Sequence, residues 1–233
     1  MFQNKVVIFG DGLLGSTIKR LTDWDIVSRK QDGVDINKRE TYRDVFLYYQ
    51  EILNCVGYTD TYSQDKSQHW QTNYLGLMKL VHFTNRFRQK LIHISSDYIY
   101  ANSKHPASEN DPPSNAPNWY SYTKLLGDAY VQAMSVNYLL IRTSFKPKPF
   151  PYQKALTCQT GNFDYVDVIA SKIIELIEKD ATGIFNVGTE TKTIYDLALE
   201  TNSSVQKMDQ RIHATMPTNI TMDISKMKKF LEN

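Results

Sequence analysis

The sequence predicts an α/β fold: a doubly wound, Rossmann-like parallel sheet followed by a smaller C-terminal portion. Short apolar segments alternate with longer segments of helical periodicity over most of the 233 residues. A GxGxxG pattern stands directly after the first apolar segment, at residues 10–15, and three prolines in residues 145–151 later interrupt the alternation. Because strands that alternate with helices connect through right-handed crossovers, we expect a parallel sheet with helices on both faces.

The first half of the chain supplies four expected strands. Residues 5–9 form a continuous apolar run too short for a helix, which is typical of a strand buried on both faces. Asn37 and Glu40 have the spacing of a capping box, which predicts a helix from Asn37 to about Gln50. The other expected elements are a helix at 13–22, strands at 25–28, 51–57 and 91–97, and a long helix at about 66–89.

The second half continues the alternation around two proline-rich segments. Residues 101–119 contain four prolines with several Asn and Ser residues, which predicts a loop long enough to be functional. Residues 145–151 are not expected to form regular structure. The remaining expected elements are helices at about 119–136 and 164–179, strands at 138–144 and 183–188, a helix start at 193–199, an extended piece at 219–223 and a final helix at 224–233.

Composition and charge exclude several classes of protein. The 27 Lys and Arg residues nearly balance the 25 Asp and Glu residues, without a basic block, which argues against a dedicated nucleic-acid-binding protein. No apolar stretch approaches the ~18 residues that would suggest a membrane span. The N-terminus shows no cationic leader, and Cys55 and Cys158 form neither a disulfide framework nor a zinc pattern. We therefore expect a cytoplasmic protein with no metal site and no nucleic-acid or membrane partner.

The glycine pattern between the first strand and the first helix indicates a dinucleotide site. Gly10, Gly12 and Gly15 permit a tight turn and a close approach of the backbone to a pyrophosphate at the helix N-terminus. The Ser-Arg-Lys run at 28–30 follows the second strand, where NAD enzymes usually carry an acidic residue, and it favours the 2′-phosphate of NADP. An ordinary βα turn and a solvated charged turn are the alternative interpretations. NADPH is the expected cofactor, with NADH left open.

Ser96, Tyr120 and Lys124 have the pattern of a carbonyl-reduction site. Tyr120 and Lys124 are four residues apart, so both project from one face of the expected helix. Ser96 stands at the carboxyl end of a strand, where its hydroxyl can bind a substrate oxygen beside Tyr120. A phenol with a pKa of about 10 is a poor proton donor alone, but a neighbouring ammonium lowers that pKa toward working pH. In a chain with 15 tyrosines, a Tyr and a Lys four residues apart are by themselves most simply an exposed pair on a helix. The catalytic interpretation depends on where this pair lies: after a strand that ends in Ser and a proline-rich loop, in a chain that begins with GxGxxG.

Taken in order, the motifs resemble those of the extended short-chain dehydrogenase/reductases, and among them the dTDP-4-dehydrorhamnose reductases, which reduce the 4-keto group of nucleotide sugars. The resemblance covers most of the chain, and several ordered motifs at matching spacing are more specific than any single one. These motifs are GDGLLG at 10–15, NCVGYT at 54–59, NYLG at 73–76, SSDYIY at 95–100, the loop with Glu109 and Pro112-Pro113, YSYTKLLGD at 120–128, LIRTS at 140–144, GIFNVG at 183–188 and MPTNITMDISKMKKFL at 216–231.

The resemblance implies a role for each catalytic position. Tyr120 would donate the proton, with Lys124 as its electrostatic partner and as a ligand of the nicotinamide ribose. Ser96 would bind the keto oxygen, and Asp97 would help to position the substrate. Asn73 would support a water relay to the lysine.

The resemblance also implies the cofactor contacts. The glycines would hold the pyrophosphate, Arg29 the 2′-phosphate, and Asp35 with Ile36 the adenine edge. The implied cofactor-binding residues are Gly10, Gly12, Leu13, Leu14, Gly15, Ser28, Arg29, Asp35, Ile36, Val56, Gly57, Tyr58 and Lys124.

Two positions depart from patterns within this superfamily. Phe9 stands where the first glycine of the family's GxxGxxG would fall, so Gly10 is expected to serve instead, as in the shorter Rossmann form. Tyr98 stands where the 4,6-dehydratases of the superfamily carry Glu, which disfavours a dehydration reaction.

The segment after the fifth expected strand is short. Only 16 positions separate Phe145 from Gly161, where relatives carry a longer substrate-binding segment. We therefore expect a dinucleotide-binding Rossmann domain at 1–145. A reduced substrate-binding portion, interleaved with the last strands and helices of the sheet, is expected at 146–233.

These features lead to one main functional hypothesis and two alternatives. The main hypothesis is an NADPH-dependent enzyme that reduces the 4-keto group of a 4-keto-6-deoxy nucleotide sugar, with hydride from the nicotinamide and the proton from Tyr120. A nucleotide-sugar epimerase that retains NAD and a noncatalytic NAD(P)-binding regulatory subunit are the alternatives. A nucleotide sugar is the expected small-molecule partner, and a homodimer is left open.

Overall fold

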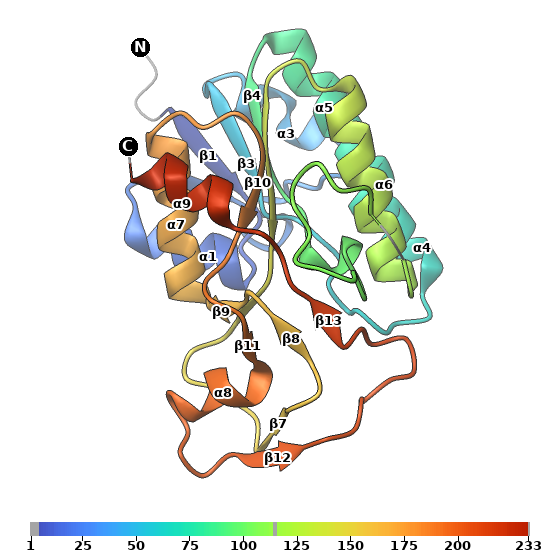
Figure 1. Cartoon of the computed structure of the whole chain (residues 1–233). Coiled ribbons are helices and arrows are strands. Elements are labelled where there is room, and N and C mark those ends of the chain that lie inside the picture. The colour runs from blue at the N-terminus through green and yellow to red at the C-terminus, as the bar shows by residue number, and fades with distance from the viewer. Residues whose placement is uncertain (1–4, 114–115, 233) are drawn as a thin grey trace.

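Six parallel strands form the central sheet, in the order β10-β5-β4-β3-β1-β2 (Figure 1). The computed structural model describes residues 5–113 and 116–232. Four neighbouring strands at the centre consist of residues that are almost all buried, which explains their continuous apolar runs. The predicted doubly wound α/β fold is confirmed. The six strands are β1 (Val6–Phe9), β2 (Asp25–Val27), β3 (Glu51–Asn54), β4 (Lys90–Ile94), β5 (Tyr138–Thr143) and β10 (Gly183–Val187).

Helices cover both faces of this sheet (Figure 1). One face carries α1 (Leu13–Leu21), α7 (Val166–Glu178) and α9 (Ser225–Leu231), which pack on a shared apolar cluster. The other face carries α3, α5 and α6, which pack on a second cluster. The helical elements of that second face and of its connections are α2 (Arg29–Asp32), α3 (Arg39–Phe46), α4 (Lys66–His69), the π-helical turn η1 (Trp70–Gly76), α5 (Leu77–Phe87), the short 3₁₀ turn η2 (Asp97–Ile99) and α6 (Trp119–Met134).

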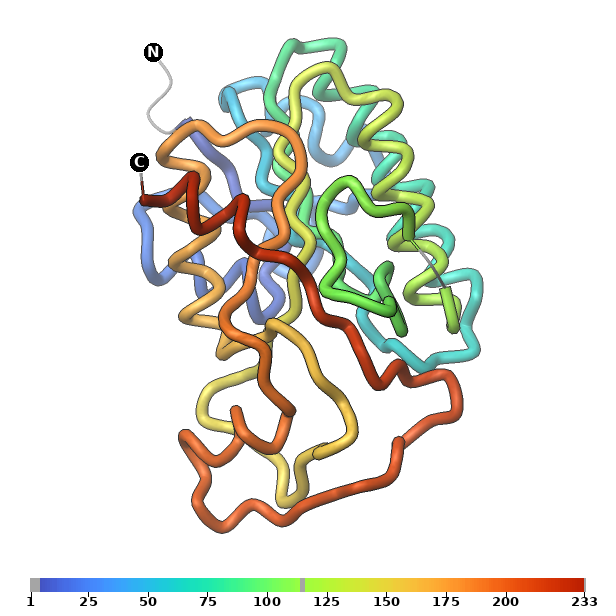
Figure 2. The backbone as a smooth tube through the Cα atoms, viewed as in Figure 1, coloured from blue at the N-terminus to red at the C-terminus, as the bar shows by residue number. Residues whose placement is uncertain are grey.

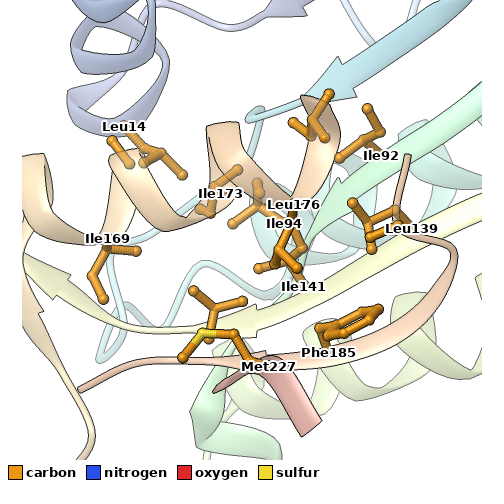
Figure 3. Close-up of a cluster of buried hydrophobic side chains, with 14 of the residues drawn as sticks. Leu14, Ile92, Ile94, Leu139, Ile141, Ile169, Ile173, Leu176, Phe185 and Met227 are labelled. Carbon is orange, nitrogen blue, oxygen red and sulfur yellow. The ribbon is translucent and has the colours of Figure 1, made fainter. Parts of the chain in front are cut away.

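The apolar cluster on the α7 face holds the sheet to its helices. Ile92 and Ile141 project from the sheet, and Ile169 and Ile173 project from α7 to meet them (Figure 3). All four side chains are fully buried. Since burying one such side chain stabilises a fold by about 1.5–3 kcal/mol, this cluster fixes the sheet rigidly enough to position side chains at its edge.

A smaller lobe lies beyond the carboxyl ends of the sheet strands (Figure 2). It has its own buried core, which includes Phe163, Leu197 and Ile220. The chain leaves the large sheet after β5 and returns to it for α7, β10 and α9, so the two parts are interleaved. The lobe consists of β6 (Phe145–Lys146), β7 (Lys154–Leu156), β8 (Thr160–Gly161), β9 (Asp164–Tyr165), β11 (Lys192–Thr193), α8 (Ile194–Leu199), β12 (Gln206–Met208) and β13 (Asn219–Ile220).

Local predictions differ from the structure at several places. The strands expected at 51–57 and 91–97 end at Asn54 and Ile94, because the chain turns away from the sheet there, and the short strands β8 and β11 were not expected. The helix expected from Asn37 begins at Arg39, and the predicted capping box is wrong because the residue before the helix is Lys38 and no side chain caps it. The long helix expected at 66–89 is divided by the π-helical turn η1. Two short strand pairs of the lobe, β7 with β12 and β6 with β9, have no sequence periodicity and were not expected as strands.

Candidate active site

The glycine turn after β1 has the geometry of a nucleotide-binding turn. Gly10 has a φ of +109°, a conformation that side-chain-bearing residues rarely adopt. A Cβ at Gly15 would lie 1.9 Å from the Gly10 carbonyl oxygen, so α1 can pack against the turn only because this position has no side chain. A Cβ at Gly12 would meet no atom within 4 Å. Gly12 therefore faces open space at the N-terminus of α1, where a phosphate would be favoured.

A cavity of about 310 Å³ opens beside this turn. Nine of the predicted cofactor residues line it, whereas Leu13, Leu14, Gly15 and Lys124 do not. Leu14 is instead buried in the core. The predicted residues that line the cavity are Gly10, Gly12, Ser28, Arg29, Asp35, Ile36, Val56, Gly57 and Tyr58. Lys30, from the run at 28–30 that favours a 2′-phosphate, also lines the cavity. The lining residues to which the sequence gave no cofactor role are Phe9, Asp11, Val34, Asn37, Cys55, Gln68 and Thr72.

Positive charge gathers at the β2 end of this cavity. Arg29 and Lys30 are exposed there, on the short helix α2. The Ser28 hydroxyl caps α2 by accepting a hydrogen bond from the Gln31 N–H at 3.1 Å. Asp11 also lines the cavity, but its carboxylate accepts a hydrogen bond from Gln31 Nε2 at 3.3 Å. The two cations are therefore placed to receive an added phosphate.

The structure brings the three predicted catalytic side chains to the carboxyl edge of β4. Ser96 is buried just after the strand, and its hydroxyl is hydrogen-bonded to Tyr120 at the start of α6. Lys124, one turn further along α6, donates from Nζ to the Ile94 carbonyl oxygen at 2.6 Å. Ser96 and Tyr120 are thus placed to contact one substrate oxygen, with an ammonium close behind them.

Burial controls the protonation of these groups. Desolvation raises the pKa of Tyr120 to about 12, with a smaller opposing effect from the hydrogen bond to Ser96. Desolvation lowers the pKa of Lys124 to about 8, against the attraction of Asp128. The expected lowering of the tyrosine pKa by the lysine is therefore wrong for this structure, because the Lys124 ammonium is directed at the Ile94 carbonyl. Tyr120 carries its proton at neutral pH.

Asp97 lies beside Ser96 and has a charged partner to which the sequence gave no role. The Asp97 side chain is completely buried, and desolvation raises its pKa to about 7. The charge of Lys146, on β6, opposes this rise. Lys146 stands three positions after the end of β5 at Thr143, and this place near the carboxyl end of a sheet strand is the signal that could have found it.

Asn73 lies in the π-helical turn η1, and hydrogen bonds hold its amide from both sides. Its Oδ1 accepts from the Tyr58 N–H at 2.8 Å, and its Nδ2 donates to the Tyr58 carbonyl and to Thr123 Oγ1. A Cβ at Gly127 would lie 2.8 Å from the Asn73 carbonyl oxygen, so η1 and α6 are in close contact. Asn73 therefore connects Tyr58 of the cavity lining to α6, and its predicted water relay stays a prediction.

A buried ionic network fixes α6 and the proline-rich loop. Arg142 on β5 binds both oxygens of Asp128, at 3.0 and 2.9 Å, and also donates to the Glu109 carbonyl of the loop. Ser95 Oγ donates to the same Asp128 carboxylate at 3.0 Å. The bidentate geometry holds α6 in register with β4 and β5, and thus holds Tyr120 and Lys124 over the strand ends.

Aromatic side chains join the two lobes in front of Tyr120. The Tyr98 ring meets the Tyr120 ring edge-on at 5.9 Å, and the Tyr98 hydroxyl lies 3.2 Å from that of Tyr62. The Tyr62 ring stacks on His213 of the smaller lobe at 4.8 Å. Gln159 Nε2, also in that lobe, donates to the Tyr98 hydroxyl at 3.3 Å. Tyr120 thus lies at the junction of the sheet and the lobe.

Comparison with known proteins identifies the family. The sequence profile of the RmlD substrate binding domain matches residues 4–146, more than half of the chain. The chain belongs to the RmlD substrate-binding-domain family. This result confirms the resemblance seen in the motifs, and the match ends at Lys146, where the short segment begins. No curated protein matches the sequence.

Solved structures share the fold of this RmlD-family chain along nearly its whole length. A dTDP-4-dehydrorhamnose reductase from Bacillus anthracis strain Ames, in complex with NADP, aligns with a TM-score of 0.82 at 19% identity, covering 97% of this chain and 96% of that one. A hypothetical dTDP-4-dehydrorhamnose reductase from Sulfolobus tokodaii aligns with a TM-score of 0.81 at 23% identity, covering 97% and 94%. The enzyme WbmG from Bordetella bronchiseptica, in complex with NAD and UDP, aligns with a TM-score of 0.77 at 15% identity, covering 98% and 88%.

A metal-binding group of side chains and a membrane-spanning helix are both absent from the described part of this RmlD-family chain. Within residues 5–113 and 116–232, no group of three or more His, Cys, Asp or Glu side chains is arranged to hold a metal ion. In the same ranges no helix is both long and apolar enough to cross a membrane.

Proposed function

We propose that the protein is an NADPH-dependent reductase of the 4-keto group of a 4-keto-6-deoxy nucleotide sugar. The observation that carries this proposal is the convergence of Ser96, Tyr120 and Lys124 at the carboxyl edge of the sheet, next to a glycine-lined cavity. Membership of the RmlD family and the names of the structural relatives support the same reaction. The smaller lobe is the proposed substrate side, and the cytoplasm is the proposed location. A homodimer is compatible with this proposal.

The residues of the cavity fit a phosphorylated dinucleotide. Gly10 and Gly12 would take the pyrophosphate at the N-terminus of α1, since a side chain at Gly12 would project into the open space. Arg29 and Lys30 would take the 2′-phosphate, which favours NADPH over NADH. When bound, NADPH supplies a hydride to the carbonyl carbon.

The chain's own residues would handle the proton. The Tyr120 hydroxyl keeps its proton at neutral pH because its pKa is raised to about 12, so it is a donor in the resting protein. Ser96, hydrogen-bonded to Tyr120, would hold the substrate oxygen within reach of that proton. Donation leaves a phenolate, and Lys124 would stabilise it only after its ammonium turns from the Ile94 carbonyl, to which it donates at 2.6 Å.

The direct test is turnover of a defined substrate. The purified protein is incubated with NADPH and dTDP-4-dehydrorhamnose, NADPH oxidation is followed by absorbance, and the product is analysed by NMR. We expect stoichiometric loss of NADPH and formation of a 4-hydroxy sugar. No oxidation with this substrate or with other 4-keto nucleotide sugars would contradict the proposal and favour a noncatalytic binding subunit.

An epimerase that retains NAD is the second candidate, because one structural relative binds NAD and UDP. The positive charge of Arg29 and Lys30 at the cavity argues against it. The mass of the nucleotide that copurifies with the protein separates the two candidates, since an epimerase would retain NAD through purification.

A further inference from the structure

A second cavity, of about 580 Å³, lies at the edge of the sheet where the strands begin, and we call it the amino-edge cavity. Glu51 and Lys90, the first residues of β3 and β4, both line it and are partners in register. Ser96 follows the other end of β4, so the whole strand separates this cavity from the catalytic groups. A ligand held here is therefore distinct from the substrate. The lining includes Lys5, Glu51, Arg88, Gln89, Lys90 and Asp180.

Two buried oxygen atoms of lining residues have no hydrogen-bond donor. Glu51 is 2% exposed and Gln89 is 6% exposed. Gln89 Nε2 donates to the carbonyl oxygens of Phe46 and Tyr49, at 2.6 and 2.7 Å, which fixes the amide. Within the described part of the chain, neither Gln89 Oε1 nor Glu51 Oε2 has a partner. Because a buried acceptor without a donor is costly, a ligand with N–H donors would be bound favourably here.

The Lys5 side chain controls access to the Glu51 carboxylate. Lys5 Nζ lies 2.7 Å from Glu51 Oε1, and the Lys5 side chain is 52% exposed whereas that of Glu51 is 3% exposed. The lysine therefore covers the carboxylate from the solvent side. Since a lysine side chain is a flexible four-carbon stem, its rotation opens the carboxylate to a ligand ammonium group.

The same cavity has a cation without an acidic partner. Lys90 Nζ lies 2.9 Å from Asp180 Oδ1, so this lysine is already paired. Arg88, the exposed residue with a φ of +56° at the end of α5, also lines the cavity. Among residues 5–113 and 116–232, no carboxylate pairs with the Arg88 guanidinium. The cavity thus offers acceptors for an ammonium group and a guanidinium for a carboxylate, and Leu47 and Phe87 add apolar surface.

We propose that the amino-edge cavity binds a small zwitterion of the amino-acid class, with its ammonium group on Glu51 and Gln89 and its carboxylate on Arg88. An apolar side chain of the ligand would contact Phe87. A simple amine would leave Arg88 without a partner, and a simple carboxylate would leave both buried acceptors without a donor. This inference goes beyond the proposed function and does not depend on it.

The test uses three ligands that share one carbon skeleton. Isothermal titration calorimetry on the purified protein measures the binding of L-leucine, of 4-methylpentanoate, which lacks the ammonium group, and of 3-methylbutylamine, which lacks the carboxylate. We expect saturable binding of L-leucine. Each analogue should bind about tenfold more weakly or worse, since each loses a charge-assisted contact.

Three variants assign the affinity to individual contacts. Glu51→Gln should weaken the binding of L-leucine and 3-methylbutylamine by about tenfold, without loss for 4-methylpentanoate. Arg88→Asn, in which asparagine tolerates the positive φ, should weaken the binding of L-leucine and 4-methylpentanoate. Lys5→Ala should strengthen the binding of L-leucine, because it uncovers Glu51. Asp44→Asn and Arg43→Asn, at exposed residues of α3 outside the cavity lining, are controls matched in charge and should change no affinity.

The opposite results would overturn the inference. No saturable binding of L-leucine by the wild type would show that the cavity holds only water. Equal affinity for L-leucine and either analogue would contradict the contact assigned to the missing group, and unchanged binding in Arg88→Asn would place the ligand elsewhere. If circular dichroism shows that Glu51→Gln does not fold, Lys5→Ala and Arg88→Asn still decide the matter, because they are expected to change the affinity in opposite directions. NADPH oxidation tests the proposed function separately, so the failure of one is distinguishable from the failure of the other.

Discussion

The cofactor side and the substrate side of this protein are built in different ways. Strands β1, β3, β4 and β5 are four to six residues long and almost wholly buried, and apolar clusters support them from both faces. The strands of the smaller lobe are two or three residues long and enclose one modest core. In the proposed function the sheet would thus position the cofactor and the proton donor, and the lightly built lobe would supply groups that face the substrate.

The largest effect is expected from removing the centre of the small lobe. Phe163 is completely buried in that core, so Phe163→Ala should lower the free energy of unfolding by about 3–5 kcal/mol. Because the sheet has separate cores, the variant should still bind NADPH while losing substrate turnover. Chemical denaturation measures the free energy of unfolding, NADPH fluorescence measures cofactor binding, and NADPH oxidation measures turnover. Tyr152→Ala, at an exposed side chain of the same lobe, is the matched control. An equal loss of NADPH binding and of substrate turnover would contradict the independence of the two regions.

A matched pair of glycine variants tests the cofactor side. In Gly15→Ala the new methyl group would clash with the Gly10 carbonyl, so we expect destabilisation of about 1–3 kcal/mol together with weaker NADPH binding. In Gly12→Ala the methyl group enters open space, so the stability should be kept while NADPH binding weakens. Thermal unfolding and NADPH titration distinguish these outcomes. Equal stability of the two variants would contradict the close contact between Gly15 and the Gly10 carbonyl.

A smaller effect is expected at the charged end of the cofactor cavity. Arg29→Ala removes one cation beside the expected 2′-phosphate, so the affinity for NADPH should fall about tenfold with little change for NADH. Arg43→Ala, at an exposed residue of α3 that does not line the cavity, is the control. Equal losses for both nucleotides would place the 2′-phosphate elsewhere.

The smallest effect is a shift in pH dependence. Lys124 has its pKa lowered to about 8, so its ammonium is lost as the pH rises through that value, and kcat/KM should fall there. Asp97 has its pKa raised to about 7, so activity that needs its carboxylate should fall as the pH drops through that value. Lys124→Arg keeps a charge at higher pH and should move the alkaline limb upward. An unchanged alkaline limb in that variant would show that Lys124 does not control the fall of kcat/KM at high pH.

The contrast between the two regions also explains what the sequence could predict. The six sheet strands and the helix that carries Tyr120 and Lys124 follow from local periodicity and were predicted, although two of the strands end earlier than expected. The Ile94 carbonyl that binds Lys124 comes from a distant strand, so the resulting effect on the pKa of Tyr120 was not predictable from helical spacing. Asn37 has the spacing of a helix cap, yet it lines the cofactor cavity and its N–H bonds to Asp35. Capping rules use only neighbouring residues, so they do not predict a contact that depends on the tertiary structure.

The substrate side was predictable only in outline. Two-residue strands such as β6 and β9 carry no periodicity, and they form because segments distant in the chain meet beyond the sheet edge. The charge of Lys146 opposes the rise in the pKa of Asp97 although the two residues are far apart in the chain, a relation that the order of residues does not state. The contacts of the smaller lobe therefore need the fold to be found.

The replacement of Tyr120 by phenylalanine tests the central claim most directly. Tyr120→Phe removes only the hydroxyl that is bonded to Ser96 and leaves the ring packed against Tyr98. Turnover of dTDP-4-dehydrorhamnose should fall by about 10²-fold or more while the dissociation constant for NADPH stays at the wild-type value. Unchanged turnover in this variant would contradict the assignment of Tyr120 as the proton donor.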